Sequence, residues 1–268
     1  MMISRRLLPL IAALAVGFLP ALPAAAELAP HRAFYSLKLG AVRSGSSVVG
    51  VRGAMTINVE RTCDGWIMGQ RMSMVASDAK GGEIVQEIDF TGWESAGGET
   101  YRFASRSRGG AKSEDVKGQA WIGAQGGPGK AEYVLPKAMT LEIPPTTLFP
   151  FGHLSWLIGR AEAGARMAPR IVFDGVAEEG LQEVVIFIGP RIAPEEQENK
   201  IPGPLTERPG WNMRAAYYPV DSRAAEPVYE IEARQLDNGV ATSLILDYQM
   251  FSVILDLERI EAVAPPVC

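Results

Sequence analysis

The side chains that most often bind zinc or act in nucleophilic catalysis are scarce in this sequence. Its 268 residues include two cysteines, Cys63 and Cys268, and two histidines, His31 and His153. No two of the four are close together in the sequence, whereas a structural zinc site needs about four ligands, usually in closely spaced pairs. We therefore expect no metal site, and nothing in the sequence indicates another cofactor.

The standard catalytic motifs are missing. The sequence contains no G-x-S-x-G, no H-E-x-x-H, no Walker motif and no G-x-G-x-x-G between a strand and a helix. His153 lies two residues before Ser155 at the start of a predicted helix, where the helix dipole disfavours a charged imidazole. A histidine that packs or caps is favoured over a general base, so we assign no catalytic residue and expect no enzymatic activity.

A group of acids around one turn offers the remaining chemistry. Phe173-Asp174-Gly175 has the composition of a compact turn, and Glu178 and Glu179 follow it. Two carboxylates can act as the acid and base of a glycosidase, or they can hold a cation. The alternative function is therefore a hydrolase or transglycosylase acting on envelope glycan, with Asp174 or Glu178 as the active acid. A solvated loop is the favoured interpretation.

Residues 1–26 have the three parts of a secretory signal peptide. Arg5 and Arg6 precede an apolar run over 7–22, and small residues follow at 24–26. Two prolines and a glycine interrupt the apolar run, so it is poorly suited to span a membrane as a helix. We expect cleavage after Ala26, export to the periplasm, and a mature protein that does not span the membrane.

The charge balance of the mature chain argues against nucleic acid as a partner. Losing Arg5 and Arg6 with the signal peptide reduces 26 basic residues to 24, against 31 acidic residues. Nucleic acid binding normally requires a basic face that neutralises phosphates. The densest basic run, 102–112, is interrupted by alanine, serine and glycine, which is typical of a solvated strand and turn.

Export also changes the interpretation of the two cysteines. In an oxidising compartment, two thiols without a third competitor most simply form one disulfide. Thiols joined in this way cannot act as nucleophiles. The expected bridge joins Cys63 to Cys268.

Most of the mature chain alternates apolar and polar residues with a period of two, as β-strands with one exposed face do. A hairpin is predicted where VYEIEARQL and VATSLILDY flank Asp237-Asn238-Gly239, because Asn-Gly supplies the positive φ angles of tight turns. So many strands predict an antiparallel, mainly β domain. The other predicted strands cover 35–39, 51–60, 66–74, 84–90, 101–106 and 251–260.

One segment, near 150–164, has helical spacing instead. Leu154, Leu157 and Ile158 recur on one side, and Trp156 adds a second apolar flank. Such a helix has to be covered, either inside a curved sheet that wraps round it or against the outside of a sheet. In both arrangements Trp156 should be buried. If the helix lies inside, these four residues are candidates to line a cavity.

No linker or internal repeat divides the mature chain, so we expect one domain over 27–268. The longest predicted loop covers 189–210, where proline, glutamate and glutamine dominate. Its run EEQEN has the composition of solvated surface, and we assign it no role.

Several segments in order resemble a known family. They are VRGAMTINVERTCDGWIMGQRM, IDFTGWES, TTLFPFGH, IVFDG and LDNGVATSLILDYQMFSVILDLERIEA. Their order resembles the periplasmic cell-envelope integrity protein B family of Alphaproteobacteria. The resemblance implies a spirally wound, open antiparallel β-barrel enclosing one central α-helix, with Cys63 bonded to Cys268. It also implies a role in envelope integrity and stress resistance, with no established enzymatic activity.

Together, these expectations predict a non-catalytic periplasmic protein that binds a lipid, a lipoprotein or a peptide segment in or at its barrel. An alternative partner is another envelope protein. An open barrel leaves a free sheet edge, and such an edge can accept a strand from a second protein.

Overall fold

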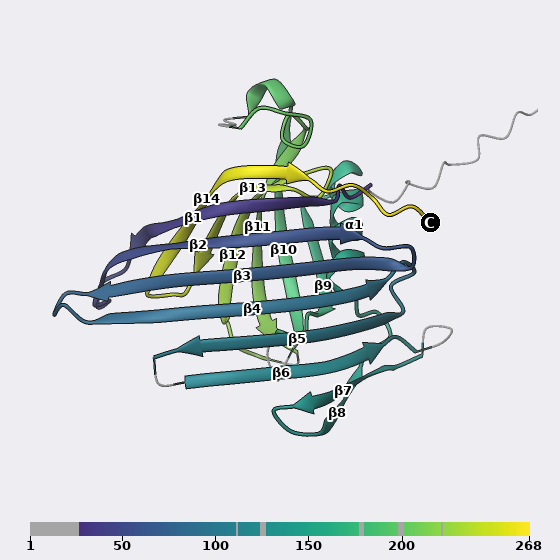
Figure 1. Ribbon diagram of the computed structural model, residues 1–268, viewed down its shortest axis with the longest axis horizontal. Helices are drawn as coiled ribbons and strands as arrows, with labels where there is room; N and C mark the ends of the chain where they lie inside the picture. The colour runs from purple at the N-terminus through teal and green to yellow at the C-terminus, as the bar shows by residue number, and fades with distance from the viewer. Residues whose placement is uncertain (1–26, 111, 124–126, 177–179, 198–200, 221) are drawn as a thin grey trace, which may run out of the picture.

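A computed structural model describes residues 27–110, 112–123, 127–176, 180–197, 201–220 and 222–268 (Figure 1). The predicted signal peptide lies outside the described residues. The strands are β1 His31–Val42, β2 Val48–Arg61, β3 Gly65–Asp78, β4 Glu83–Ser95, β5 Thr100–Gly109, β6 Lys112–Trp121, β7 Gly129–Leu135, β8 Met139–Ile143, β9 Met167–Phe173, β10 Leu181–Ile192, β11 Gly210–Pro219, β12 Tyr229–Leu236, β13 Ala241–Asp247 and β14 Phe251–Ala262. One α-helix, α1 Pro150–Glu162, and a short 3-10 helix, Pro194–Glu196, complete the described elements.

All these strands form one antiparallel sheet in the order β8-β7-β6-β5-β4-β3-β2-β1-β14-β13-β12-β11-β10-β9. The first and last strands, β1 and β14, pair in the middle of the sheet. The sheet curls from there toward two edges, β8 and β9, which the segment containing α1 connects (Figure 1). The expected fold class, a spirally wound open antiparallel barrel with one helix, is confirmed.

The strand register shows which side chains face inward. Tyr35 lies opposite both Met55 and Leu257, and all three are buried. Side chains two positions apart share a face, so the inward rows carry the apolar residues and the outward rows carry the ion pairs. Arg71 with Asp89 is an example of an outward pair, since both side chains are more than half exposed.

The helix begins and ends where its sequence predicts. Pro150 occupies the first turn, where a missing N–H costs nothing, and Gly164 adopts a positive φ just beyond the last turn. Leu157 and Ile158 pack with Val59 of β2 and with the inward faces of β9, β10 and β11. The helix therefore fills the barrel at the end where β2 finishes and β3 begins (Figure 1).

The predicted hairpin is present as β12 and β13, with Gly239 at a φ of 88°. The predicted loop over 189–210 is wrong at its start, because β10 continues to Ile192. A register shift between Ile188 and Arg191 carries the strand past Pro190, and Arg191 then pairs with Trp211. A bulge of this kind lets a strand accommodate proline.

No helix in the described ranges is both long enough and apolar enough to cross a membrane.

Candidate binding sites

The four predicted cavity-lining residues of α1 meet in one core cluster. Leu157 and Ile158 are 7% and 0% exposed. Leu154 and Trp156 are partly buried and pack against the same cluster. The helix thus brings all four together. That they line a ligand cavity stays a prediction.

We expected Trp156 to be buried, but it is only partly buried, packed against the core around α1. Its ring lies on the flank of α1 that faces β9, where the guanidinium of Arg170 sits 5.0 Å from the ring centroid. His153 stacks on the same indole at 6.0 Å between centroids. Burial, with a smaller contribution from the charge of Arg170, lowers the pKa of His153 to about 4. The imidazole is therefore neutral at pH 7, and this suits the packing role favoured from the sequence.

Glu94 of β4, which was not among the predicted site residues, is a buried acid at the start of α1. It is 2% exposed, and its two carboxylate oxygens accept N–H groups of Phe151 at 2.7 Å and Gly152 at 2.8 Å. Burial raises its pKa to about 7, although the two N–H bonds act in the opposite direction. The first N–H groups of a helix have no partner within it, and a carboxylate suits the positive end of the helix dipole. Glu94 therefore caps α1 from the barrel wall.

The candidate acid Asp174 forms hydrogen bonds that stabilise the turn in which it lies. Its Oδ1 accepts the N–H of Val176 at 3.0 Å, and its main-chain carbonyl accepts the hydroxyl of Tyr101 at 2.9 Å. Burial raises the pKa of the Asp174 carboxyl to about 6. Glu178 and Glu179 lie outside the described residues. Within the described part of the chain, no group of three or more His, Cys, Asp or Glu side chains is arranged to hold a metal ion.

Cys63 and Cys268 form a disulfide, as predicted, with an S–S distance of 2.14 Å. Cys63 lies in the turn between β2 and β3, three residues before Trp66, whose side chain packs against the core around α1. Trp66 stacks on Phe151 in the first turn of α1, with 5.4 Å between centroids. The bridge thus fastens the segment after β14 to the helix-filled end of the barrel (Figure 1).

The opposite end of the barrel leaves apolar side chains partly uncovered on its inward face. Leu244 and Leu246 of β13 face inward, because they lie opposite the fully buried Leu255 and Val253. Both leucines are nevertheless only partly buried. Val51 at the start of β2 and Phe251 at the start of β14 share this environment. We call these residues, Val51, Leu244, Leu246 and Phe251, the open-end surface.

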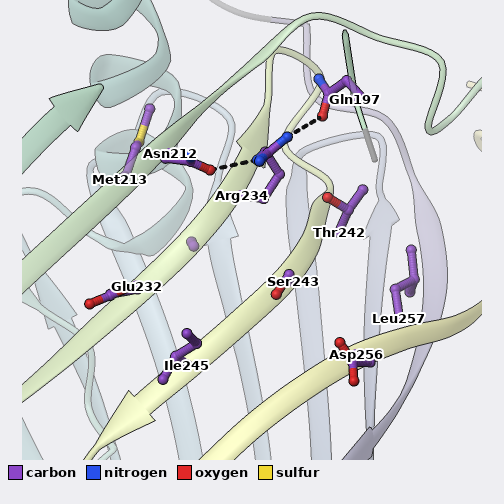
Figure 2. Close-up of a pocket in the computed structure, with 11 residues that line it drawn as sticks. Gln197, Asn212, Met213, Glu232, Arg234, Thr242, Ser243, Ile245, Asp256 and Leu257 are labelled. Carbon is purple, nitrogen blue, oxygen red and sulfur yellow. Dashed lines mark hydrogen bonds between the residues drawn. The ribbon is translucent and has the colours of Figure 1, made fainter. Parts of the chain in front are cut away.

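A polar pocket of about 400 Å³ lies against strands β11 to β14 (Figure 2). Asn212, Arg234, Ser243 and Asp256 occupy neighbouring positions on the four successive strands. They alternate along their strands with the inward-facing apolar residues, so this row faces outward. Glu232, Thr242, Ile245 and Gln197 also line the pocket, which we call the Arg234 pocket.

Two neutral amides hold the guanidinium of Arg234. Its Nε donates to Asn212 Oδ1 at 2.5 Å and its Nη1 donates to Gln197 Oε1 at 3.3 Å (Figure 2). The amide of Gln197 is oriented in turn, since its Nε2 donates to the carbonyl of Arg208 at 2.7 Å. Gln197 belongs to the run EEQEN, which we predicted to be solvated surface without a role. The structure instead places it at the edge of a pocket.

The comparisons with known proteins agree with the fold. The family model described as EipB-like matches residues 23–264. The chain is 29% identical over 254 residues to the cell envelope integrity protein EipB of Brucella abortus (strain 2308), covering 88% of this chain and 86% of that protein. It is also similar to the crystal structure of a beta-barrel-like protein of a domain of unknown function from Brucella abortus. That match has a TM-score of 0.81 and 26% identity, and covers 90% of this chain and 100% of the other. The similarity to an envelope protein and the disulfide both point to an envelope or periplasmic location.

Proposed function

This chain belongs to the EipB-like family, and from that premise we propose that it is a non-catalytic periplasmic protein that supports cell-envelope integrity and stress resistance. We propose that it does so by binding a lipid, a lipoprotein or an apolar peptide segment in its barrel. The name of its Brucella relative supports the envelope role. The periplasmic location rests on the signal peptide predicted for residues 1–26.

The open-end surface is the observation that carries the binding proposal. Its four residues face the barrel interior and pack against a buried cluster that includes Leu37, Met55 and Leu255, but they keep part of their apolar surface exposed. Covering apolar surface gains about 25 cal/mol per Å², so an acyl chain or an apolar side chain that enters from this end would be stabilised there. Uncovered apolar surface of this kind marks interaction sites in many proteins.

The state of the buried acids supports binding rather than catalysis. Glu94 and Asp174 both have raised pKa values, as a general acid would need. Both oxygens of Glu94, however, are occupied by the N–H groups of α1, and Asp174 accepts a bond within its own turn. Each carboxylate therefore has a structural use.

Native mass spectrometry and lipid extraction of the protein purified from its own periplasm test the proposal. We expect an apolar molecule to co-purify, and we expect Leu246→Asp to lose it because the new carboxylate lies on the inward face. Ile254→Asp is the matched control, since Ile254 is also partly buried but lies on the outward face, opposite Ile245. The proposal is wrong if no apolar molecule co-purifies and no apolar probe binds, or if Leu246→Asp retains the ligand.

The alternative, a glycan hydrolase or transglycosylase, draws support from the pKa of about 6 at Asp174, which would suit a general acid. Incubation with peptidoglycan fragments tests it. We expect no turnover. Turnover that disappears in both Asp174→Asn and Glu178→Gln would replace the binding proposal with this one.

A partner strand is a second form that binding could take, and the two sheet edges differ in how well they suit it. Leu148 already bonds to the β9 edge, through its N–H to Ile171 and its carbonyl to the N–H of Phe173. Edge strands accept strands from other proteins, so β8 is the better candidate. Photo-crosslinking from Thr140 of β8 in the periplasm should capture an envelope protein if this mode operates, and the same probe at Pro169 of β9 serves as the control.

A further inference from the structure

The Arg234 pocket contains one cationic side chain that forms no ion pair with any described residue. Three charged side chains line it: Glu232, Arg234 and Asp256. Glu232 lies 3.5 Å from the guanidinium of Arg214, and Asp256 forms an ion pair with Lys38. Among the described residues, no carboxylate lies within 4 Å of Arg234 in the way that Asp89 lies beside Arg71. Arg214 also binds Glu230 at 2.7 Å, so it is shared between two carboxylates. Arg234 is therefore the cation of the pocket without a carboxylate partner among the described residues.

The partners of Arg234 orient the guanidinium without cancelling its charge. A guanidinium has five N–H donors, and the bonds to Asn212 and Gln197 use two of them. The remaining three are on Nη1 and Nη2, at the end of the side chain. A carboxylate or phosphate binds this end through two parallel hydrogen bonds. Because both partners are neutral amides, neither cancels the charge of the guanidinium, and its free N–H groups remain available to such a group.

The other polar residues of the pocket favour a ligand that also carries hydroxyl groups. Ser243 lies between Arg234 and Asp256 in the cross-strand row, so the backbones of these two charged residues are about 10 Å apart at the usual strand spacing. Ionised Asp256 and Glu232 can only accept hydrogen bonds, so they suit hydroxyl donors and repel further negative charge. The pocket thus separates one anion-binding position from a set of hydroxyl-binding positions.

We propose that the Arg234 pocket binds a hydroxyl-bearing organic anion, of the class of sugar phosphates and sugar acids. The anionic group binds the free end of Arg234, and the hydroxyls bind Asp256, Glu232 and Ser243. The volume of about 400 Å³ is within the range of small-molecule sites. This site is distinct from the open-end surface, because the residues of its row face outward and those of the open end face inward.

Calorimetric titration at low salt tests the ligand class. The probes are glucose 6-phosphate and glucuronate, with neutral glucose and inorganic phosphate as matched controls that each lack one of the two features. We expect both sugar anions to bind, and each control to bind at least about tenfold more weakly, since one bond to a charged group is worth about a factor of ten or more.

Substitution of Arg234 tests the assignment of the site. Arg234→Gln should weaken both sugar anions at least about tenfold, and Arg234→Lys should also weaken them, because lysine keeps the charge but lacks the planar fork. Arg71→Gln is the matched control, as Arg71 also lies on the outward face but is paired with Asp89. The Arg71→Gln variant should bind both sugar anions with unchanged affinity. Circular dichroism melts confirm that each variant is folded, and Arg234→Lys remains informative if the glutamine variant is not.

Three outcomes overturn the proposal. The first is that neither sugar anion binds at 10 mM. The second is that they bind equally well to Arg234→Gln, or to Arg234→Lys where only that variant folds. The third is that inorganic phosphate or glucose binds as tightly as the sugar anions. The result is separable from the proposed barrel function, because Leu246→Asp should leave anion binding intact and Arg234→Gln should leave the apolar ligand in place.

Discussion

Two charged side chains, Glu94 and Arg234, differ in what their hydrogen bonds do. Those of Glu94 hold the fold together, whereas Arg234 keeps donors free for a ligand. Glu94 is 2% exposed, and both of its carboxylate oxygens are taken by N–H groups of α1. Arg234 is half-buried and uses two of its five donors, both on neutral amides. A buried carboxyl group whose oxygens both accept main-chain N–H groups serves the fold. A charge that is oriented but not neutralised can still bind a ligand.

The side chains around Glu94 are more deeply buried than those around Arg234. Beside Glu94, Tyr101 stacks on Phe149 at 5.2 Å between centroids, and both rings are at most 1% exposed. Glu94 also lines a pocket of about 380 Å³, together with Phe151 and Gly152. On β13, beside Arg234, every residue is partly exposed, on the inward and the outward face alike. Substitutions in the helix-filled end should therefore change stability, and substitutions in the Arg234 pocket should change binding.

The largest effect is expected at the disulfide, which belongs to the helix-filled end. Cys268→Ser opens a link between residues 205 positions apart, for which loop-closure entropy gives about 5 kcal/mol of stability. We expect a markedly lower melting temperature in the variant and in reduced wild type, measured by calorimetry. An unchanged midpoint, or two free thiols on alkylation of the native protein, would contradict this. Sugar-anion affinity well below the melting temperature should not change.

Removal of Glu94 should have the next largest effect. Glu94→Ala removes the acceptor of a buried N–H of Phe151 and of a partly buried N–H of Gly152. A buried N–H without an acceptor costs about 1 to 3 kcal/mol, so we expect a loss of about 2 to 3 kcal/mol in the free energy of unfolding. Denaturant titration measures it. Glu87→Ala is the control on the exposed outward face of the same strand, and it should change stability by less than about 0.5 kcal/mol. Equal losses in the two variants would show that Glu94 is not a cap.

The pH dependence of the free energy of unfolding should reveal the raised pKa of Glu94. Its pKa is raised from 4.5 to about 7 in the folded protein, so between these values the folded state binds more protons than the unfolded state. The contribution of this residue to stability is therefore present below pH 4.5 and is lost as the pH rises to 7, by about 3 kcal/mol.

Comparison with Glu94→Gln isolates that slope from the other titrating groups. His153, with a lowered pKa of about 4, contributes in the opposite direction, and Asp174 contributes in the same direction as Glu94, but both are present in wild type and variant. The difference in unfolding free energy between the two proteins should fall from pH 4.5 to pH 8. A difference that stays constant with pH would show that Glu94 has an ordinary pKa.

The sequence predicted eight of the strands and the helix, but it did not predict β6 to β11 or the long-range contacts. Period-two alternation and the Asn-Gly turn predicted these strands and the hairpin correctly, since both depend on neighbouring residues. The same alternation could have revealed Glu94, because Ile88, Phe90 and Glu94 fall on one face of β4. That its partner would be a helix N-terminus 57 residues away depends on the curl of the whole sheet, which no local pattern records.

The Arg234 pocket was harder to anticipate for a related reason. Its row crosses four strands, so it depends on three separate registers, of which only that of the β12–β13 hairpin follows from a turn in the sequence. Gln197 comes from an irregular segment whose composition is that of solvated surface. What decides its role is the hydrogen bond to Arg208, a tertiary contact.

The smallest expected effect tests whether the charge of the pocket depends on its neighbours. Arg214 contacts Glu230 at 2.7 Å and Glu232 at 3.5 Å, so Arg214→Gln leaves Glu232 unpaired in the pocket. A second negative charge at about 8 Å in a solvated site costs about 0.5 kcal/mol, and we expect both sugar anions to bind about two- to threefold more weakly at low salt. The loss should disappear at 0.5 M sodium chloride, where exposed charges are screened over a few ångströms. A loss that persists at high salt would mean that Arg214 shapes the pocket instead of neutralising Glu232. No loss at low salt would mean that Glu232 does not influence the anion bound at Arg234.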